Sequence, residues 1–281
     1  AVLTDEQAGE VNLGAGVDLS VSAATSSPTI TEINTLVTSL RTTSGMNGKI
    51  TATLDGTVSD AQAKTLTTDK TKNDAITVKL SDAVIADAAN LSVAADKTTV
   101  AIDAGLATGI AGGASDIASA LTAAGTTIDW GSAVDATFTV GVTGANQVDD
   151  LNTIMANTTG VITATVSTQA MADALGATGL AKLSLGTVPA ENAKLTMTVA
   201  DGSVDAAELK ALAGKTSVEV TATAATTFTG SVSDINALLT AATNDDVEIT
   251  ATADFSLSDS TVAVSDLATL DAANGTGNVI V

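Results

Sequence analysis

The sequence contains no cysteine, no histidine and no tyrosine, and its 281 residues include one tryptophan, three phenylalanines and two prolines. A chain without cysteine has no disulfide framework and no thiol chemistry. A chain without histidine has no Ser-His-Asp triad and no imidazole general acid or base. We therefore expect a protein that is not an enzyme, with no catalytic residue and no cofactor.

Positive charge is also scarce. Eleven Lys and Arg residues stand against 32 Asp and Glu residues, which gives a net charge of −21 and a pI near 4.1. Nucleic-acid phosphates and anionic membrane surfaces require basic groups that this chain lacks, so we expect no nucleic-acid partner. The most apolar stretch, 106–125, is interrupted by Gly112, Gly113 and Asp116, so we expect no membrane insertion either.

Ala and Thr are abundant, with 53 and 48 residues, and they occur in recurring short patterns. One pattern is Ile/Val-Thr-Ala-Thr, in which apolar and polar residues alternate as in a strand with one buried face. It occurs at 50–53, 162–165, 220–223 and 249–252, with variants at 76–80, 183–185 and 195–199. A shorter strand is expected after Gly56, Gly202 and Gly230, before the following helix.

The second pattern is typical of helix starts. Ser-Asp precedes an apolar residue five times, where the Ser hydroxyl can cap the helix and the Asp favours the positive end of its dipole. The five are Ser59, Ser81, Ser115, Ser233 and Ser265, and related starts are Thr31, Asn146, Ser167 and Asp205. Asp205 and Glu208 are expected to form a capping box.

Helix starts and strands keep a nearly constant spacing, which predicts a repeat protein. The nine starts lie about 29 residues apart, and a strand follows most of them after 15 to 19 residues. A unit this small must stack on its neighbours, so the sequence predicts an α/β solenoid of short helices and parallel strands. It would occupy 28–281, with least regularity at 82–113, after a strand and turn segment at 1–27. An antiparallel β-sandwich array is the alternative fold.

Three segments carry a family resemblance, namely 203–212, 229–238 and 264–272. They resemble the Ala/Thr/Asp-rich repeat tracts of giant secreted surface proteins of marine cyanobacteria and other aquatic bacteria, including S-layer-like, adhesin-like and extracellular-fibre proteins. The resemblance covers roughly 28–281 and is strongest in 143–281. It implies an extracellular structural role at the cell surface and no catalytic residue. The glycine-rich calcium nonapeptide of many such proteins is absent here.

Candidate metal and sugar sites are weak. Segment 201–208 has the Gly turn and closing Glu of the second half of an EF-hand loop, but Met197 and Val199 stand where the first half needs acids. The pairs Asp149-Asp150 and Asp245-Asp246 fit solvated turns better than calcium ligands between chains. Trp130, the single tryptophan, is expected to pack rather than bind sugar. Calcium is therefore not an expected requirement.

The Thr-x-Thr pairs of the strands should share an outward face, which resembles the ice-binding face of some antifreeze solenoids. Lys79, Glu219 and Glu248 would interrupt such a ladder, so we expect an ordinary polar strand face.

The sequence finishes on Val279, Ile280 and Val281, which we expect to form a strand edge that pairs with another strand. Its partner would be a second copy or an adjacent segment of a longer parent chain, since the sequence starts at Ala1 without Met. We expect a non-enzymatic structural module of a secreted bacterial cell-surface or filament protein that assembles by edge or end-to-end contacts. An adhesin or calcium-dependent ligand-binding module is the alternative.

Overall fold

Helices and strands alternate along the chain, and the described strand pairs are all parallel. The computed structural model describes residues 18–21, 27–43, 47–123, 127–131, 134–140, 147–166, 170–171 and 179–281. The chain divides into two compact units, 1–136 and 137–281, and strand β8 (Asp135–Val140) lies across their boundary. Among the described residues, no helix has both the length and the apolar character needed to cross a bilayer.

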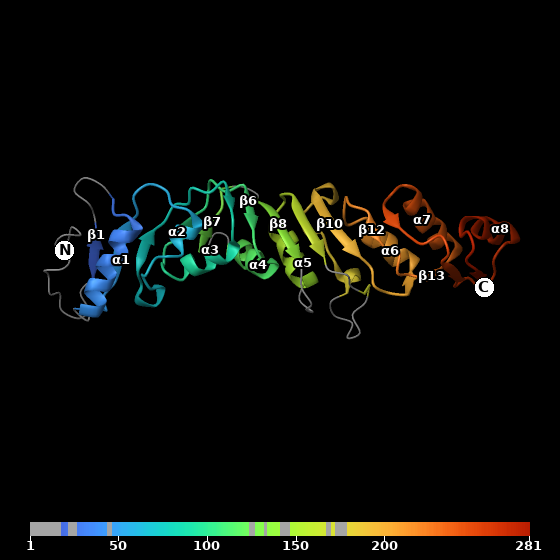
Figure 1. The fold of residues 1–281 in the computed structure, drawn as a ribbon, viewed down its shortest axis with the longest axis horizontal. Coiled ribbons are helices and arrows are strands. Elements are labelled where there is room, and N and C mark those ends of the chain that lie inside the picture. The colour runs from blue at the N-terminus through green and yellow to red at the C-terminus, as the bar shows by residue number, and fades with distance from the viewer. Residues whose placement is uncertain are drawn as a thin grey trace. The chain divides into compact units, whose positions relative to one another are not determined.

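The first unit contains small parallel sheets and short helices (Figure 1). Its helices are α1 (Ile30–Thr38), which continues into a π-helical turn (Ser39–Thr43), α2 (Asp60–Ala63), a 3-10 turn (Lys70–Lys72), α3 (Ala88–Ala95) and α4 (Ala114–Thr122). Its strands are β1 (Leu19–Val21), β2 (Ile50–Thr53), β3 (Ala75–Thr77), β4 (Val84–Ile85), β5 (Ile102–Asp103), β6 (Gly109–Ala111) and β7 (Ile128–Asp129). The pairings are β1-β2-β3, β4-β6 and β5-β7.

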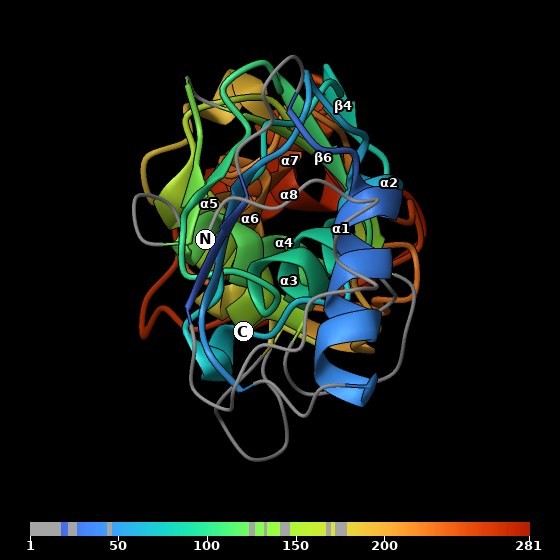
Figure 2. The same cartoon turned by 90° about the vertical axis from the view of Figure 1, so that its left-hand side faces the viewer.

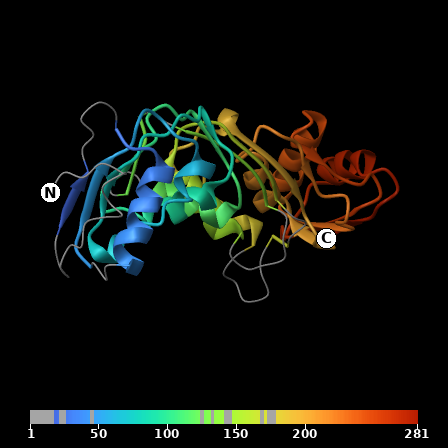
Figure 3. The ribbon, with the colours of Figure 1, turned by 60° about the vertical axis from the view of Figure 1, so that its left-hand side comes forward.

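Helices and strands of this unit form separate layers. Helix α3 packs against α2 on one side and against α4 on the other, and Figure 2 shows α3 and α4 side by side. The sheet β1-β2-β3 forms a layer apart from α1 (Figure 3). The helices bury apolar residues at helical spacing, as Ile33, Leu36 and Val37 do in α1.

The second unit has two ladders of parallel strands and a row of helices (Figure 1). Its helices are α5 (Gln147–Asn157), the 3-10 turns Leu180–Lys182 and Ala190–Asn192, α6 (Ala206–Ala213), α7 (Val232–Thr243) and α8 (Val264–Ala273). One ladder is β9 (Ile162–Val166), β10 (Ala193–Thr198), β12 (Val220–Thr221) and β14 (Val247–Glu248). The other is β11 (Ser203–Asp205), β13 (Thr227–Gly230), β15 (Asp254–Leu257) and β16 (Val279–Ile280).

Each strand pairs with one that follows it after a short, nearly constant stretch of chain. In the second ladder Ser203 pairs with Thr227, Thr227 with Asp254, and Phe255 with Val279, which are steps of 24, 27 and 24 residues. Parallel neighbours need such a crossover, and a helix lies in each of these connections. The antiparallel alternative is therefore wrong for the described strands.

Alternating strand residues build the core. Strands β2 and β9 show the predicted pattern, with Ile and Ala buried and Thr exposed. In the second ladder Phe228 pairs with Phe255, and both rings are buried. Most other core residues are Ile, Leu, Val and Ala.

Several predicted strands are not strands. The short strand expected after Gly230 is instead the start of α7, with Ser231 as its cap, and the one expected after Gly56 is only an isolated bridge at Val58. Residues 249–252 form a turn, and the strand of that segment is the two-residue β14 just before it. Residues 183–185 have no strand structure, although Leu183 is buried. At 249–252 and at 183–185, the local alternation of apolar and polar residues therefore did not decide the structure. The segment 82–113 holds β4, α3, β5 and β6, while 1–27 lies mostly outside the described residues.

Candidate assembly edge and the joints between successive segments

The helix starts are built as capping boxes, but not at every predicted residue. In α1, α2 and α7 a hydroxyl accepts from the backbone N–H three residues later, and that later side chain accepts from the cap backbone. The three pairs are Thr29 with Glu32, Ser59 with Gln62, and Ser231 with Asp234. The cap of α7 is thus Ser231 rather than the predicted Ser233, because Asp234 serves as the third helical residue and not the first.

Other predicted starts are displaced or differently made. Helices α4 and α8 begin one residue before Ser115 and Ser265, and their caps, Gly113 and Ala263, have no side-chain hydrogen bond. Asp205 caps α6 by accepting from the Glu208 N–H, but the reciprocal bond of a full capping box is missing. Ser81 starts no helix, since α3 begins at Ala88 after an Asp87 cap. The starts proposed at Asn146 and Ser167 lie outside the described residues.

A segment is one strand and helix step of the chain, and a joint is a contact between two successive segments. Carboxylates from one segment also cap the helix of the preceding segment. The Asp82 carboxylate accepts from the backbone N–H of Asp60, the first residue of α2, at 2.6 Å. The Asp259 carboxylate accepts from the N–H of Val232, the first residue of α7, at 2.7 Å. These bonds satisfy helix N–H groups that have no partner within the helix. The Ser81-Asp82 motif therefore caps the preceding helix, α2, through Asp82.

Two asparagines form a second kind of joint. Asn34 of α1 donates from Nδ2 to the carbonyl of Thr65, and its Oδ1 accepts from the N–H of Thr67. Asn152 of α5 makes the same pair of bonds with the Lys182 carbonyl and the Ser184 N–H. Each side chain therefore holds the backbone 30 to 33 residues further along the chain. The sequence analysis missed this role, although an Asn at the fifth residue of α1 and at the sixth residue of α5 was a visible signal.

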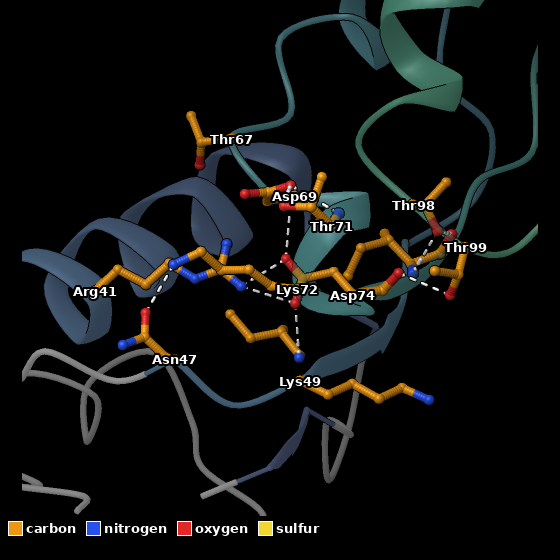
Figure 4. Close-up of polar contacts among 12 residues, drawn as sticks. Arg41, Asn47, Lys49, Thr67, Asp69, Thr71, Lys72, Asp74, Thr98 and Thr99 are labelled. Atoms are coloured by element: carbon orange, nitrogen blue, oxygen red, sulfur yellow. Dashed lines mark hydrogen bonds and ion pairs between the residues drawn. The ribbon is translucent and has the colours of Figure 1, made fainter. Parts of the chain in front are cut away.

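Asp74 lies at the centre of a polar cluster in the first unit (Figure 4). It is fully buried, and its carboxylate accepts two bonds from Arg41 Nη2, at 2.7 and 2.8 Å. It also accepts from the backbone N–H groups of Ile50 at 2.8 Å and Asp69 at 2.7 Å. Arg41 is the only arginine of the chain. The cluster joins the turn after α1, the start of β2 and the 3-10 turn.

Local hydrogen bonds lower the pKa of three carboxyl groups, and burial lowers the pKa of one lysine. The Thr29 backbone and hydroxyl lower the pKa of Glu32, and the Ser231 hydroxyl and backbone lower the pKa of Asp234. The Thr71 hydroxyl and backbone likewise lower the pKa of Asp69. Burial lowers the pKa of Lys215, whose ammonium donates to the Leu183 carbonyl. The three carboxylates therefore act as caps, and the Lys215 ammonium holds a backbone carbonyl.

The half-loop at 201–208 is a joint between a strand and a helix. Met197 and Val199 are fully buried, so their side chains are part of the core. The Asp201 carboxylate accepts from the Met171 N–H, and the Asp205 carboxylate caps α6. Within the described part of the chain, no three acidic side chains converge on a point where they could hold a metal ion.

The remaining candidate residues belong to different elements of the chain. Asp149 lies in the first turn of α5, while Asp245 has a positive φ in the turn that follows α7. Trp130 is half-buried, and its indole N–H donates to the Ala120 carbonyl at 3.4 Å. An open groove over α6 and α7 is lined mainly by small residues and contains no buried unpaired polar side chain among those described.

The outward Thr residues do not form an unbroken ladder. Thr165 pairs with Thr196, and Thr198 pairs with Thr221, but Glu248 is the next partner of Thr221. A carboxylate at this position interrupts the regular array of hydroxyls and methyl groups.

The predicted assembly edge lies in β16, the last strand of its ladder. Val279 is half-buried, whereas Ile280 and Val281 are 48% and 73% exposed. Val279 and Ile280 pair with Phe255 and Ser256 of β15, which uses one edge of the strand. The described residues provide no strand for the other edge.

No protein-family model matches this sequence, and no curated protein and no solved structure shows significant similarity to it.

Proposed function

We propose that this protein is a non-enzymatic structural module of a secreted bacterial cell-surface or filament protein. In this proposal it is a repeat α/β solenoid of about nine units, roughly 29 residues each, which provides length and associates through its strand edges. The observation that carries the proposal is the stepwise parallel pairing, in which each strand meets the strand one segment later.

The polar side chains support this role. Side chains hydrogen-bond to the backbone of a neighbouring segment at Asp82, Asp259 and Asn152. These bonds hold successive segments together. The predicted secreted and cell-surface location rests on the resemblance to Ala/Thr/Asp-rich repeat tracts. A net charge of −21 would keep copies apart at low salt, and external salt would screen that repulsion.

A register-preserving deletion tests the solenoid. Removing 228–254 takes out 27 residues and joins Thr227 to Phe255, the residue that follows its own ladder partner Asp254. The joined strand, Thr227 followed by Phe255–Leu257, has the same length as β13 and β15 and can pair with β11 and β16, so the variant should fold with a cooperative unfolding transition. Deleting 228–240, about half a step, is the control and should not fold. If the two deletions behave alike by circular dichroism and thermal unfolding, the stack is not modular.

Sedimentation velocity over a range of ionic strength tests the assembling role. Assembly should increase with salt and should be weakened by Ile280→Lys, which places a charge on the exposed edge. Leu106→Lys is the matched control, because Leu106 is similarly exposed, at 53%, and belongs to the turn after β5, outside the ladder of β16. Parallel runs with calcium and with chelator distinguish the alternative, a calcium-dependent adhesin. A chain that stays monomeric in all these conditions would contradict the proposal.

A further inference from the structure

Three helices carry an asparagine in equivalent surroundings. Asn34 is the fifth residue of α1 and Asn236 is the fifth residue of α7, and both helices begin with a capping box. Asn152 lies at the corresponding place in α5. The residue before each asparagine and the residue two positions after it are buried and apolar, namely Ile33 and Leu36, Leu151 and Ile154, and Ile235 and Leu238. The three asparagines therefore lie on equivalent sides of their helices.

Asn34 and Asn152 each hold a short piece of backbone from further along the chain. In both, Nδ2 donates to a carbonyl, and Oδ1 accepts from the N–H two residues later. These held segments are 65–67 and 182–184. Their middle residues, Leu66 and Leu183, are both 2% exposed, and Leu183 has an extended backbone (φ −55°, ψ 133°). One carboxamide thus recognises a carbonyl and an N–H on either side of a buried leucine.

Asn236 holds no such segment. It is exposed, and its side chain makes no hydrogen bond to any residue that the structure describes. At the matching distance along the chain, 30 to 33 residues later, lies α8, which forms its backbone bonds largely within the helix. The residue three positions after the asparagine is buried in α1 and α5, as Val37 and Met155, whereas Leu239 of α7 is only half-buried. A polar and an apolar part of the holding site are therefore both present and accessible at α7.

The charge around α7 is complementary to that of the held segments. An exposed lysine lies one or two residues before the leucine in both, as Lys182 before Leu183 and Lys64 before Leu66. Residues 216–281, which include α7, contain nine Asp and Glu residues and no Lys or Arg. A segment that carries a lysine is therefore attracted to this part of the chain.

We propose that Asn236 and Leu239 form a docking site for an extended segment of a partner protein. The segment has the chemistry of the two held segments, namely a leucine that follows a lysine and precedes Ser or Thr. Asn236 Nδ2 donates to the carbonyl before the leucine, and Oδ1 accepts from the N–H after it. The leucine side chain covers Leu239, and the lysine remains at the acidic surface. This site goes beyond the proposed structural role, because it lies within one copy and functions whether or not copies assemble.

Peptide titration of the isotope-labelled full chain, followed by NMR, tests the site. The probe is the sequence of 63–68, Ala-Lys-Thr-Leu-Thr-Thr, acetylated and amidated so that it has no terminal charge. We expect saturable shifts of the Asn236 side-chain amide and the Leu239 backbone amide, with weaker binding at high salt. The side-chain amides of Asn34 and Asn152 are already bonded and should not shift.

Two controls show whether the carboxamide and the leucine carry the binding. Asn236→Ala removes both hydrogen bonds and should weaken binding by about tenfold or more. Asn244→Ala is the matched control, because Asn244 is an exposed asparagine at the other end of α7, and it should bind as the unmodified chain does. A peptide with Leu66→Ser should cause no shift. Circular dichroism checks that both variants are folded.

Three results would each overturn the proposal. The first is no shift at Asn236 up to the solubility limit of the peptide. The second is equal affinity of Asn236→Ala and Asn244→Ala for the peptide. The third is an equal response to the Leu66→Ser peptide. None of these results bears on assembly in sedimentation velocity, so this site and the assembling role fail separately.

Discussion

Replacing Asp74 with alanine should be the most damaging single change in the first unit. The substitution leaves Arg41 without its ion-pair partner, and the Arg41 side chain is only 12% exposed. It also removes the acceptor of the backbone N–H groups of Ile50 and Asp69. Breaking a buried pair by removing one partner costs about 3–5 kcal/mol. An unsatisfied buried donor costs a further ~1–3 kcal/mol, although the contributions overlap.

We therefore expect Asp74→Ala to lower the free energy of unfolding by at least about 3 kcal/mol, a large part of the stability of a typical domain. Asp74→Asn keeps an acceptor but no charge, so its loss should be smaller. Urea unfolding measures the total loss in the free energy of unfolding. Hydrogen exchange at the Ile50 amide measures local opening of the Asp74 cluster.

Lys79→Ala is the control for this prediction. The Lys79–Asp103 pair is 3.8 Å apart and its side chains are 51% and 42% exposed, so its loss should cost less than about 1 kcal/mol. If Asp74→Ala is no more destabilising than Lys79→Ala, the buried cluster does not stabilise the first unit and the reasoning is refuted.

Three further predictions concern the caps and calcium. Ser231→Ala should cost about 1 kcal/mol in urea unfolding, whereas Ser233→Ala should stay within about 0.5 kcal/mol; equal losses would contradict the assigned cap. Hydrogen bonds from Ser231 lower the pKa of Asp234, so their stabilisation is present above its ordinary value of 3.8 and is lost as pH falls through the lowered value. The difference in Tm between the unmodified chain and Ser231→Ala should therefore shrink on acidification, and a constant difference would argue against this linkage. Because Met197 and Val199 are core residues, a chelator should leave the Tm measured with calcium unchanged, and a clear fall would reveal a structural calcium site.

The periodic features of the fold were predictable from the sequence. Strands 50–53 and 162–165 were recognised because Ile, Ala and Thr alternate with the period of a strand. Helices begin within one residue of six of the seven predicted starts that fall on described residues. The parallel pairing followed from helices placed between successive strands.

The joints were not predictable from local patterns. The Ser81-Asp82 motif has the composition of a helix start, but Asp82 caps the helix of the preceding segment. Its role depends on which backbone N–H lies beside it, and that neighbour is 22 residues away in sequence. The same holds for Asp74, whose partners come from three separate stretches of chain. Such roles depend on tertiary contacts, which local capping preferences do not encode.

Electron microscopy of the purified chain tests the assembling role most directly. The proposed structural role predicts single particles at low salt and unbranched linear filaments at high salt, with fewer and shorter filaments for Ile280→Lys than for Leu106→Lys. Single particles at every salt and protein concentration, with both variants indistinguishable from the unmodified chain, would contradict it.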